Sequence, residues 1–188
     1  MLTNNGSIEL SNMKEINRNK NDDKNDDKKD DKKMILTCNI YDQRKSGVTS
    51  GTFMNGEWVT RSLNKINGNA SITLNKQQST FTFQPGTYTI TCDIPAYNVG
   101  IHQARLFDVT NNEPVKYGNS GISVNTNSNS HINYFTGNLK KSTTFRIEHY
   151  CESIQIGNGF GIASNFPSNC SVQHFEIYTE IQITQFAA

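Results

Sequence analysis

The chain has 188 residues, a formal net charge of +1 at pH 7 and 34% hydrophobic residues. This length suits one main domain, and the balanced charge argues against nucleic acid, because phosphate binding requires a clustered basic surface. No apolar run approaches the roughly 20 residues that span a bilayer, and the first residues lack the regions of a signal peptide, so we expect neither feature.

Residues 1–33 are highly charged and contain few apolar side chains. The run NRNKNDDKNDDKKDDKK repeats short blocks of both charge signs. Such a segment cannot bury enough apolar surface to offset the entropy of ordering it. We expect a disordered leader, either a solvated spacer or a loose contact for cations or an acidic surface. Residues 34–188 then form the predicted head domain.

From Met34 onward, short segments that favour strands are separated by loops rich in Gly, Asn and Pro. About ten short strands at this spacing are typical of a sandwich. The sequence therefore predicts an all-β, antiparallel jelly-roll sandwich. The expected strands are 34–40, 69–74, 79–83, 86–94, 102–110, 121–124, 132–137, 143–151, 153–156, 160–166 and 174–184.

The segment 86–94 alternates apolar and polar residues, which is typical of a half-buried strand. We expect Cys92 to face inward and be inert, Asp93 to face solvent, and Pro95 to end the strand.

The last segment, 174–184, alternates as clearly, so one parity should face the core. The predicted core residues are Phe175, Ile177, Ile181 and Ile183. The predicted outward residues are Glu176, Tyr178, Glu180 and Gln182.

The cysteines and histidines are too dispersed for a common metal motif or a disulfide scaffold. We expect reduced, mostly buried thiols, with Cys151–Cys170 as the first pair to test for a bridge. We expect His149 to be partly buried, and we predict neither a metal nor a cofactor. The residues are Cys38, Cys92, Cys151, Cys170, His102, His131, His149 and His174.

Catalytic motifs are not evident. Residues 157–163, GNGFGIA, fail the dinucleotide fingerprint and favour a β-turn with closely approaching backbones. No nucleophile elbow is present. Four carboxylates are expected on solvated strand faces, and we predict that the chain is not an enzyme. They are Asp93, Asp108, Glu148 and Glu152.

The segment from Tyr97 to Arg105 is the one candidate for ligand binding. Tyr97, His102 and Arg105 flank a loop, and loops on a rigid sandwich often carry binding residues. The alternative is that His102 and Arg105 pair with neighbouring strands or with another subunit.

Five motifs follow one another in a recognisable order. They are WVTRSLN, FxFQPGTYTI, PAYxVxxHQARLFDVT, FRIEHYC and GFGIASNF. This order resembles the C1q/TNF-like jelly-roll heads found in phage tail-fibre and large DNA virus proteins, over roughly Thr49 to Thr184. The resemblance implies a homotrimer with a binding role. The Gly-X-Y collagen repeats that often precede C1q-type heads are not in this sequence.

The expected function is therefore a non-enzymatic, trimeric recognition or virion surface module that binds a host or glycan ligand. The alternatives are a structural, capsid-decorating protein and, third, a glycan hydrolase. A ring of subunits would protect the edges of the sheets, and we predict Phe160 and Tyr178 at the trimer interface. We expect the protein on a virion surface or on the extracellular side of a particle.

Overall fold

The computed structural model describes residues 35–165 and 174–187. The expectations for the charged leader and for Cys170 lie outside these ranges. Within them the regular structure is all β and contains no helix. The strands are β1 (Ile35–Lys45), β2 (Val59–Thr60), β3 (Lys65–Gly68), β4 (Ile72–Asn75), β5 (Thr80–Phe83), β6 (Gly86–Tyr97), β7 (Gly100–Asp108), β8 (Glu113–Ser123), β9 (Asn127–Leu139), β10 (Thr143–Cys151) and β11 (Phe175–Phe186).

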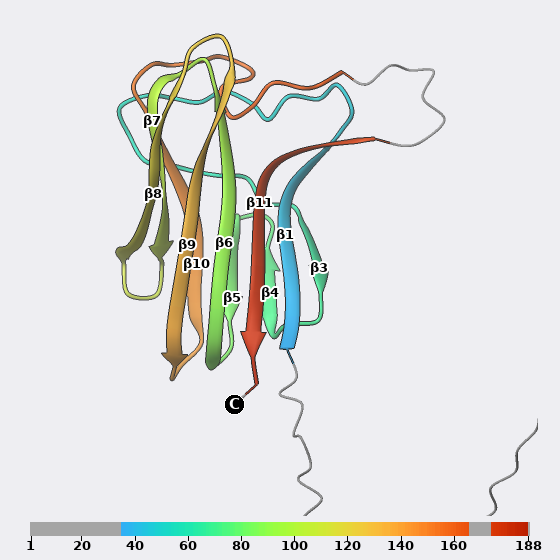
Figure 1. The fold of residues 1–188 in the computed structure, drawn as a ribbon, viewed down its shortest axis with the longest axis vertical. Helices are drawn as coiled ribbons and strands as arrows, with labels where there is room; N and C mark the ends of the chain where they lie inside the picture. Colours follow the sequence, from blue (N-terminus) through green and yellow to red (C-terminus); the bar gives the residue numbers. More distant parts are fainter. Residues whose placement is uncertain (1–34, 166–173, 188) are drawn as a thin grey trace, which may run out of the picture. The chain divides into compact units, whose positions relative to one another are not determined.

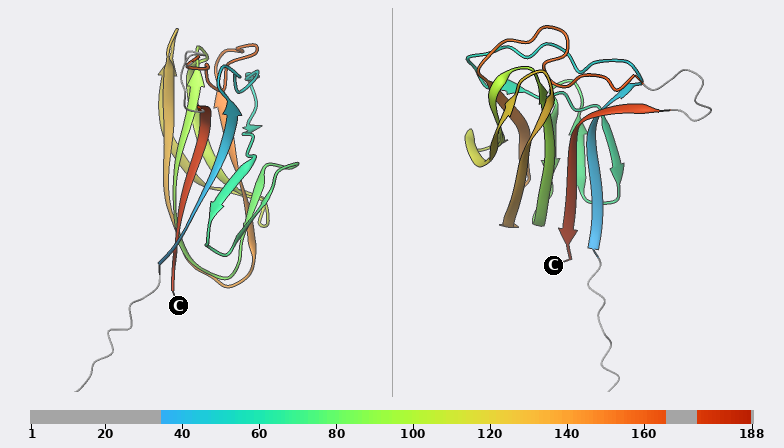
Figure 2. Two further views of the ribbon diagram at one scale, coloured as in Figure 1. Left: turned by 90° about the vertical axis from the view of Figure 1, so that its right-hand side faces the viewer. Right: turned by 45° about the horizontal axis from the view of Figure 1, so that its top comes forward.

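The strands form two antiparallel sheets packed face to face (Figures 1 and 2). The first sheet has the order β3-β1-β11-β6-β9, and the second has the order β4-β5-β10-β7-β8. The short β2 pairs with β10 at the side of the second sheet. In Figure 1 the first sheet faces the viewer.

The pairing is nested, which identifies the sandwich as a jelly roll. β1 pairs with β11, β5 with β10, β6 with β9, and β7 with β8. A long antiparallel hairpin that rolls up on itself produces this order, with the first strand beside the last. The expectation of an all-β jelly roll is confirmed.

Inward-pointing side chains from both sheets form an apolar core. Tyr88, Ile90, Cys92 and Ile94 are all fully buried, as the alternation in 86–94 predicted. The aromatic part of the core consists of Phe81, Phe83, Phe145 and Tyr88, and Phe83 stacks on Tyr88 with ring centroids 4.6 Å apart. Large aromatic side chains contribute much of the buried area in a domain of this size.

Pro95 does not end β6, contrary to expectation. The strand continues to Tyr97, and Pro95 pairs with Asn129 of β9. The last β6 residue that pairs with β11 is Asp93. Pro95 therefore has a neighbouring strand on one side only, which is where a sheet tolerates a residue without an N–H group.

The parity predicted for β11 is wrong in its first half. Glu176 and Tyr178 are buried, whereas Phe175 and Ile177 are exposed. The register with β1 shifts by one residue just after this point, between Tyr41/Glu180 and Gln43/Ile177. An extra residue in one strand is a β-bulge, and it exchanges the inward and outward side chains beyond it.

Several other segments differ from the sequence-based expectation, including 65–68 and 113–120, which form β3 and most of β8. Residues 160–165 form no strand, and 153–156 contributes a single bridge, from Gln155 to Phe53. By contrast, residues 127–130, which are all Asn or Ser and precede the expected strand 132–137, form the start of β9. Their cross-strand hydrogen bonds outweigh a composition typical of turns.

Candidate functional site

The outer face of the second sheet carries an aromatic and cationic cluster, which we call the aromatic platform: Trp58, Arg105, Tyr117 and Tyr150. Trp58 directly precedes β2, and the pairing of β2 with Glu148 and His149 holds it over the sheet. Arg105, on β7, places its guanidinium carbon 4.0 Å from the centroid of the Trp58 ring. This is a close cation–π contact.

Two tyrosines flank Trp58. The ring centroid of Tyr117, on β8, lies 5.9 Å from that of Trp58, and the centroid of Tyr150, on β10, lies 5.8 Å from it. Tyr117 is 47% exposed and Tyr150 is 38% exposed. The platform therefore presents aromatic side chains to solvent while its central ring is held from several sides.

A buried carboxylate beneath the platform holds Arg105 and the neighbouring Arg146 in place. Glu148 Oε2 accepts a hydrogen bond from Arg105 Nε at 2.6 Å, and Oε1 accepts one from Arg146 Nε at 2.7 Å. The Glu148 side chain is only 4% exposed. Arg146 also lies over the ring of Phe107, 4.5 Å from its centroid. Two cations and one anion leave this group one unit of positive charge.

The expectation of solvated carboxylates is thus wrong for Glu148, and it is also wrong for Asp108. Asp108 is 5% exposed and accepts hydrogen bonds from the backbone and the side chain of Asn111. Asp93 has the expected orientation, with 46% of its side chain exposed, and forms an ion pair with His131.

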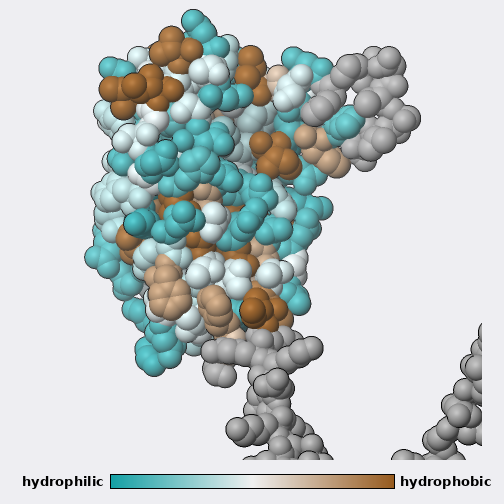
Figure 3. Space-filling view, in the orientation of Figure 1, coloured by the Kyte–Doolittle hydropathy of each residue, from teal (hydrophilic) through white to brown (hydrophobic). Residues whose placement is uncertain are grey.

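The outer face of the first sheet has a different character. We call it the amide face, after the outward side chains of β6 and β9, which are Thr89, Thr91, Asp93, Asn127, Asn129, His131 and Asn133. Figure 3 shows this side as mainly hydrophilic with separate hydrophobic patches. Phe135, Phe175 and Ile177 contribute exposed apolar side chains to it.

Three shallow hollows lie along the amide face, with volumes of about 350, 270 and 470 Å³. The first two share Pro95, Asn127, Ile177 and Tyr178 in their linings, so they are parts of one groove. The third lies beside Phe135. A hollowed, sparsely charged surface of this kind suits a large partner that projects side chains into it.

The structure does not bring the three candidate ligand-binding residues together. Tyr97 ends β6 in the first sheet, whereas His102 and Arg105 lie on β7 in the second. His102 points inward and is 1% exposed, and Arg105 points outward. His102 and Arg105 pair with β10, through His149 and Glu148, as the alternative reading proposed.

His102 and His149 form a buried pair between the sheets. His102 Nδ1 lies 3.0 Å from His149 Nε2, and His102 Nε2 lies 3.1 Å from Ser128 Oγ. Burial lowers the pKa of His102 to about 4, and the nearby charge of Arg61 adds to this effect. The pKa of His149 is lowered well below its ordinary value, first by burial and then by Arg61 and His102. Both rings are therefore neutral at pH 7.

Both residues predicted at a trimer interface make contacts within the chain. Phe160 is half-buried and stacks on Phe53, with ring centroids 4.4 Å apart. Tyr178 is 4% exposed, and its hydroxyl donates to the carbonyl of Val48 at 2.8 Å. Tyr178 is therefore not on the outward parity that suggested it, because the bulge in β11 turns it inward.

The glycine-rich segment forms a turn, as expected. Gly161 N donates to the carbonyl of Asn158 at 2.9 Å. Gly161 has a φ of +144°, and a Cβ atom there would lie 2.3 Å from the Tyr178 ring. The close approach of this turn to β11 explains the glycine.

Three cysteines are described, and all are buried and free: Cys38, Cys92 and Cys151. Burial raises the pKa of Cys151 to about 11, so this thiol is poorly nucleophilic at pH 7. Among the described residues, no group of three or more His, Cys, Asp or Glu side chains is placed to hold a metal ion. The same part of the chain contains no helix that could cross a membrane.

Sequence reasoning missed the platform because its members come from four separate segments. Trp58 is the only tryptophan of the chain, and its position just before a short strand was the one available signal. Only the register of β7, β8 and β10 places Arg105, Tyr117 and Tyr150 beside it.

No family model matches the chain, and no curated protein matches it. Similar solved structures include murine APRIL at pH 8.0, with a TM-score of 0.47 and 8% identity over 81% of this chain and 99% of that one. The globular domain of zebrafish complement 1qA protein has a TM-score of 0.44 and 14% identity over 82% of this chain and 96% of that one. The nested strand order described above makes the fold of this chain a jelly roll.

Proposed function

We propose that this chain is a non-enzymatic recognition module that binds a host or glycan ligand through the aromatic platform. The observation that carries the proposal is the contact of Trp58 with Arg105 at 4.0 Å, flanked by exposed Tyr117 and Tyr150. Trp, Tyr and Arg dominate binding energy at recognition surfaces. Sugar rings offer apolar C–H faces to aromatic rings, and their hydroxyls accept hydrogen bonds from a guanidinium.

The rigidity of the platform supports this role. Glu148 binds Arg105 and Arg146 from below, so the Arg105 guanidinium is ordered before any ligand arrives. A pre-organised surface loses less conformational entropy on binding. Because both Glu148 oxygens are engaged by arginines, this carboxylate serves better to position them than to act as a general acid or base.

We further propose that the module works as a homotrimer whose subunits meet at the amide face. Its hollows and its exposed Phe135, Phe175 and Ile177 favour contact with another protein surface. Repeating such a contact around a ring covers these side chains in every copy. In this arrangement the aromatic platform stays on the outside, as a virion or fibre surface protein requires.

Binding of the full chain to an array of immobilised glycans tests the proposal. Trp58→Ala should reduce the signal of the bound glycans at least tenfold, because it removes the stacking surface. Asn133→Ala, on the amide face, is the matched control and should bind as the parent does. Failure to bind any glycan or host-cell surface, or equal binding by Trp58→Ala, would contradict the proposal.

The second candidate is a structural, capsid-decorating protein that uses the fold for assembly alone. The hollowed amide face favours it, because that face suits protein contacts and needs no soluble ligand. Co-purification with particles, together with no glycan binding, would support this candidate over the first.

A further inference from the structure

A buried arginine between the two sheets lacks a hydrogen-bonded counter-charge. Arg61 follows β2 and is 1% exposed. Its Nε donates to Thr179 Oγ1 at 3.0 Å, and its Nη2 donates to the carbonyl of Phe160 at 3.0 Å. Burial lowers its pKa to about 9, so Arg61 is still charged at pH 7. Both acceptors are neutral, and its Nη1 has no partner among the described residues.

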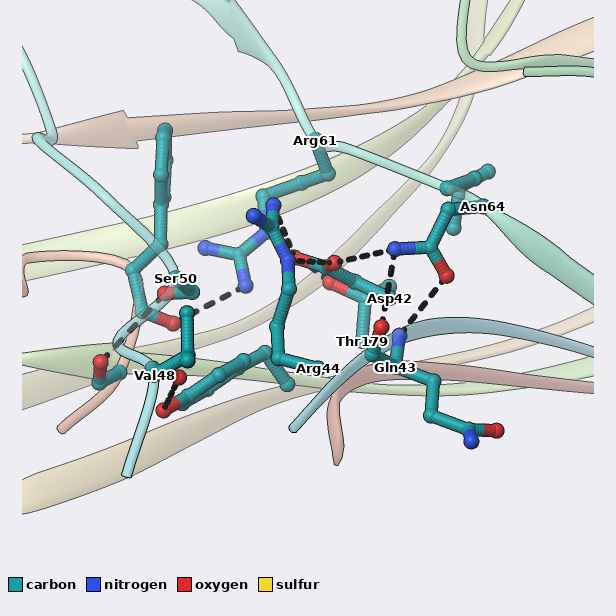
Figure 4. A network of polar contacts seen from close by, with 12 residues as sticks. Asp42, Gln43, Arg44, Val48, Ser50, Arg61, Asn64 and Thr179 are labelled. Atoms are coloured by element: carbon teal, nitrogen blue, oxygen red, sulfur yellow. Dashed lines mark hydrogen bonds and ion pairs between the residues drawn. The ribbon is translucent and has the colours of Figure 1, made fainter. Parts of the chain in front are cut away.

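The buried acid whose charge acts on Arg61 is engaged by other side chains. Asp42 is 2% exposed, and its Oδ1 accepts from Arg44 Nε at 2.6 Å and from Asn64 Nδ2 at 3.2 Å. Figure 4 shows these contacts beside Arg61 and Thr179. The negative charge of Asp42 raises the pKa of Arg61, but no hydrogen bond joins the two residues.

A second buried nitrogen without a partner lies on the same inner surface. His149 is fully buried, and its Nδ1 has no partner among the described residues. Arg61 N donates to the carbonyl of Ile147, two residues from His149 on β10, so both side chains face the interior. Phe53 contacts the His149 ring, and Phe160, stacked on Phe53, contacts the Arg61 guanidinium.

The histidine pair can present a donor on this inner surface. If the Ser128 hydroxyl donates to His102 Nε2, then His102 Nδ1–H donates to His149 Nε2, and the remaining proton of His149 lies on Nδ1. Every nitrogen of the two rings then has a defined role. Arg61 Nη1 and His149 Nδ1 are in that case two buried donors that require an acceptor.

We propose that Arg61 and His149 form an interior binding site for a small monatomic anion such as chloride. An anion accepts hydrogen bonds from both donors and neutralises a guanidinium that is otherwise buried without a contacting carboxylate. A buried charge is strongly destabilising without such compensation. A water molecule could accept the same hydrogen bonds, but it would leave the charge of Arg61 uncompensated.

Diffraction from crystals of the full chain grown with bromide tests the site directly. The expected result is an anomalous peak within hydrogen-bonding distance of Arg61 Nη1 and His149 Nδ1. Density there without an anomalous signal would identify water and overturn the proposal, as would a site with no density.

Thermal unfolding provides an independent test in solution. At constant ionic strength, replacing gluconate by chloride should raise the melting temperature of the full chain in a saturable way, because gluconate is too large for the interior. Arg61→Met should abolish this dependence, and Lys65→Met, at an exposed cation on β3, should keep it. Equal melting temperatures in both salts would overturn the proposal, and the diffraction test remains decisive if Arg61→Met does not fold.

Discussion

The two outer faces of the sandwich are built on similar alternating strands but differ in how their polar groups are held. On the amide face, the Asp93 carboxylate contacts His131 Nδ1, and each of the two side chains is about half exposed. On the other face, Glu148 is buried beneath Arg105 and Arg146. Of the two faces, the one that carries the aromatic platform holds its charges in a desolvated arrangement, and for this reason we propose recognition there and assembly at the amide face.

The largest expected effect comes from removing one carboxylate charge on each face. Glu148→Gln leaves two arginines without their shared counter-charge and should lower the free energy of unfolding by about 3 kcal/mol or more. Asp93→Asn breaks a solvated pair and should cost about 1 kcal/mol at most. Urea unfolding of both variants at pH 7 measures the two losses in free energy of unfolding. Equal losses would show that the two carboxylates contribute equally to stability, contrary to our expectation.

Acid should destabilise the protein through the histidines inside the sandwich. Above the unfolded pKa of 6.5, His102 is neutral in both states; as the pH falls toward 4, only the unfolded state takes up the proton. The free energy of unfolding should therefore fall by about 3 kcal/mol over this range from His102 alone, and His149 acts in the same direction.

Urea unfolding across this pH range measures the loss. His102→Leu should reduce the slope of the profile, because it removes one of the two buried titrating groups. The control, His131→Asn on the amide face, should leave most of the slope in place. A steep profile that persists in His102→Leu would assign the acid sensitivity to other groups.

Assembly should respond to the amide face and not to the platform. Ile177→Lys places a charge among the exposed apolar side chains of that face and should weaken the proposed trimer at least tenfold, which corresponds to about 1.4 kcal/mol. Trp58→Ala should leave assembly unchanged. Light scattering on the full chain at micromolar concentration measures both; a monomeric parent protein would refute the trimer itself.

The smallest expected change in stability comes from Tyr178, which is buried although the sequence predicted an outward side chain. Tyr178→Phe removes one hydrogen bond, to the carbonyl of Val48, and should cost about 1 kcal/mol of stability without changing the oligomeric state. A change in oligomeric state with unchanged stability would instead indicate that Tyr178 contacts another subunit.

The alternation of apolar residues predicted the core well where strands are regular. It placed Cys92 inward and Asp93 outward, because the period of two is a property of the strand alone. It failed at Tyr178, because a bulge depends on the partner strand and leaves no clear mark in the sequence. It also failed at β9, where cross-strand pairing overrides the turn preference of Asn and Ser.

The candidate sites were harder to predict, since their residues meet only through the fold. Arg105 was identified from its segment, but its contacts with Trp58 and Glu148 depend on the pairing of β7, β10 and β2. We expected His102 at the start of the strand 102–110, beside a loop, but β7 already begins at Gly100 and His102 points inward.

The single tryptophan allows ligand binding at the aromatic platform to be measured directly. Trp58 is the only tryptophan in the chain and lies at the centre of the aromatic platform, so its fluorescence reports on that surface alone. We predict that titrating the full chain with the soluble form of the glycan it binds best produces a saturable change in Trp58 emission, with the same midpoint as binding itself. Binding that saturates while the emission of Trp58 stays constant would show that the ligand occupies another surface and would contradict the account.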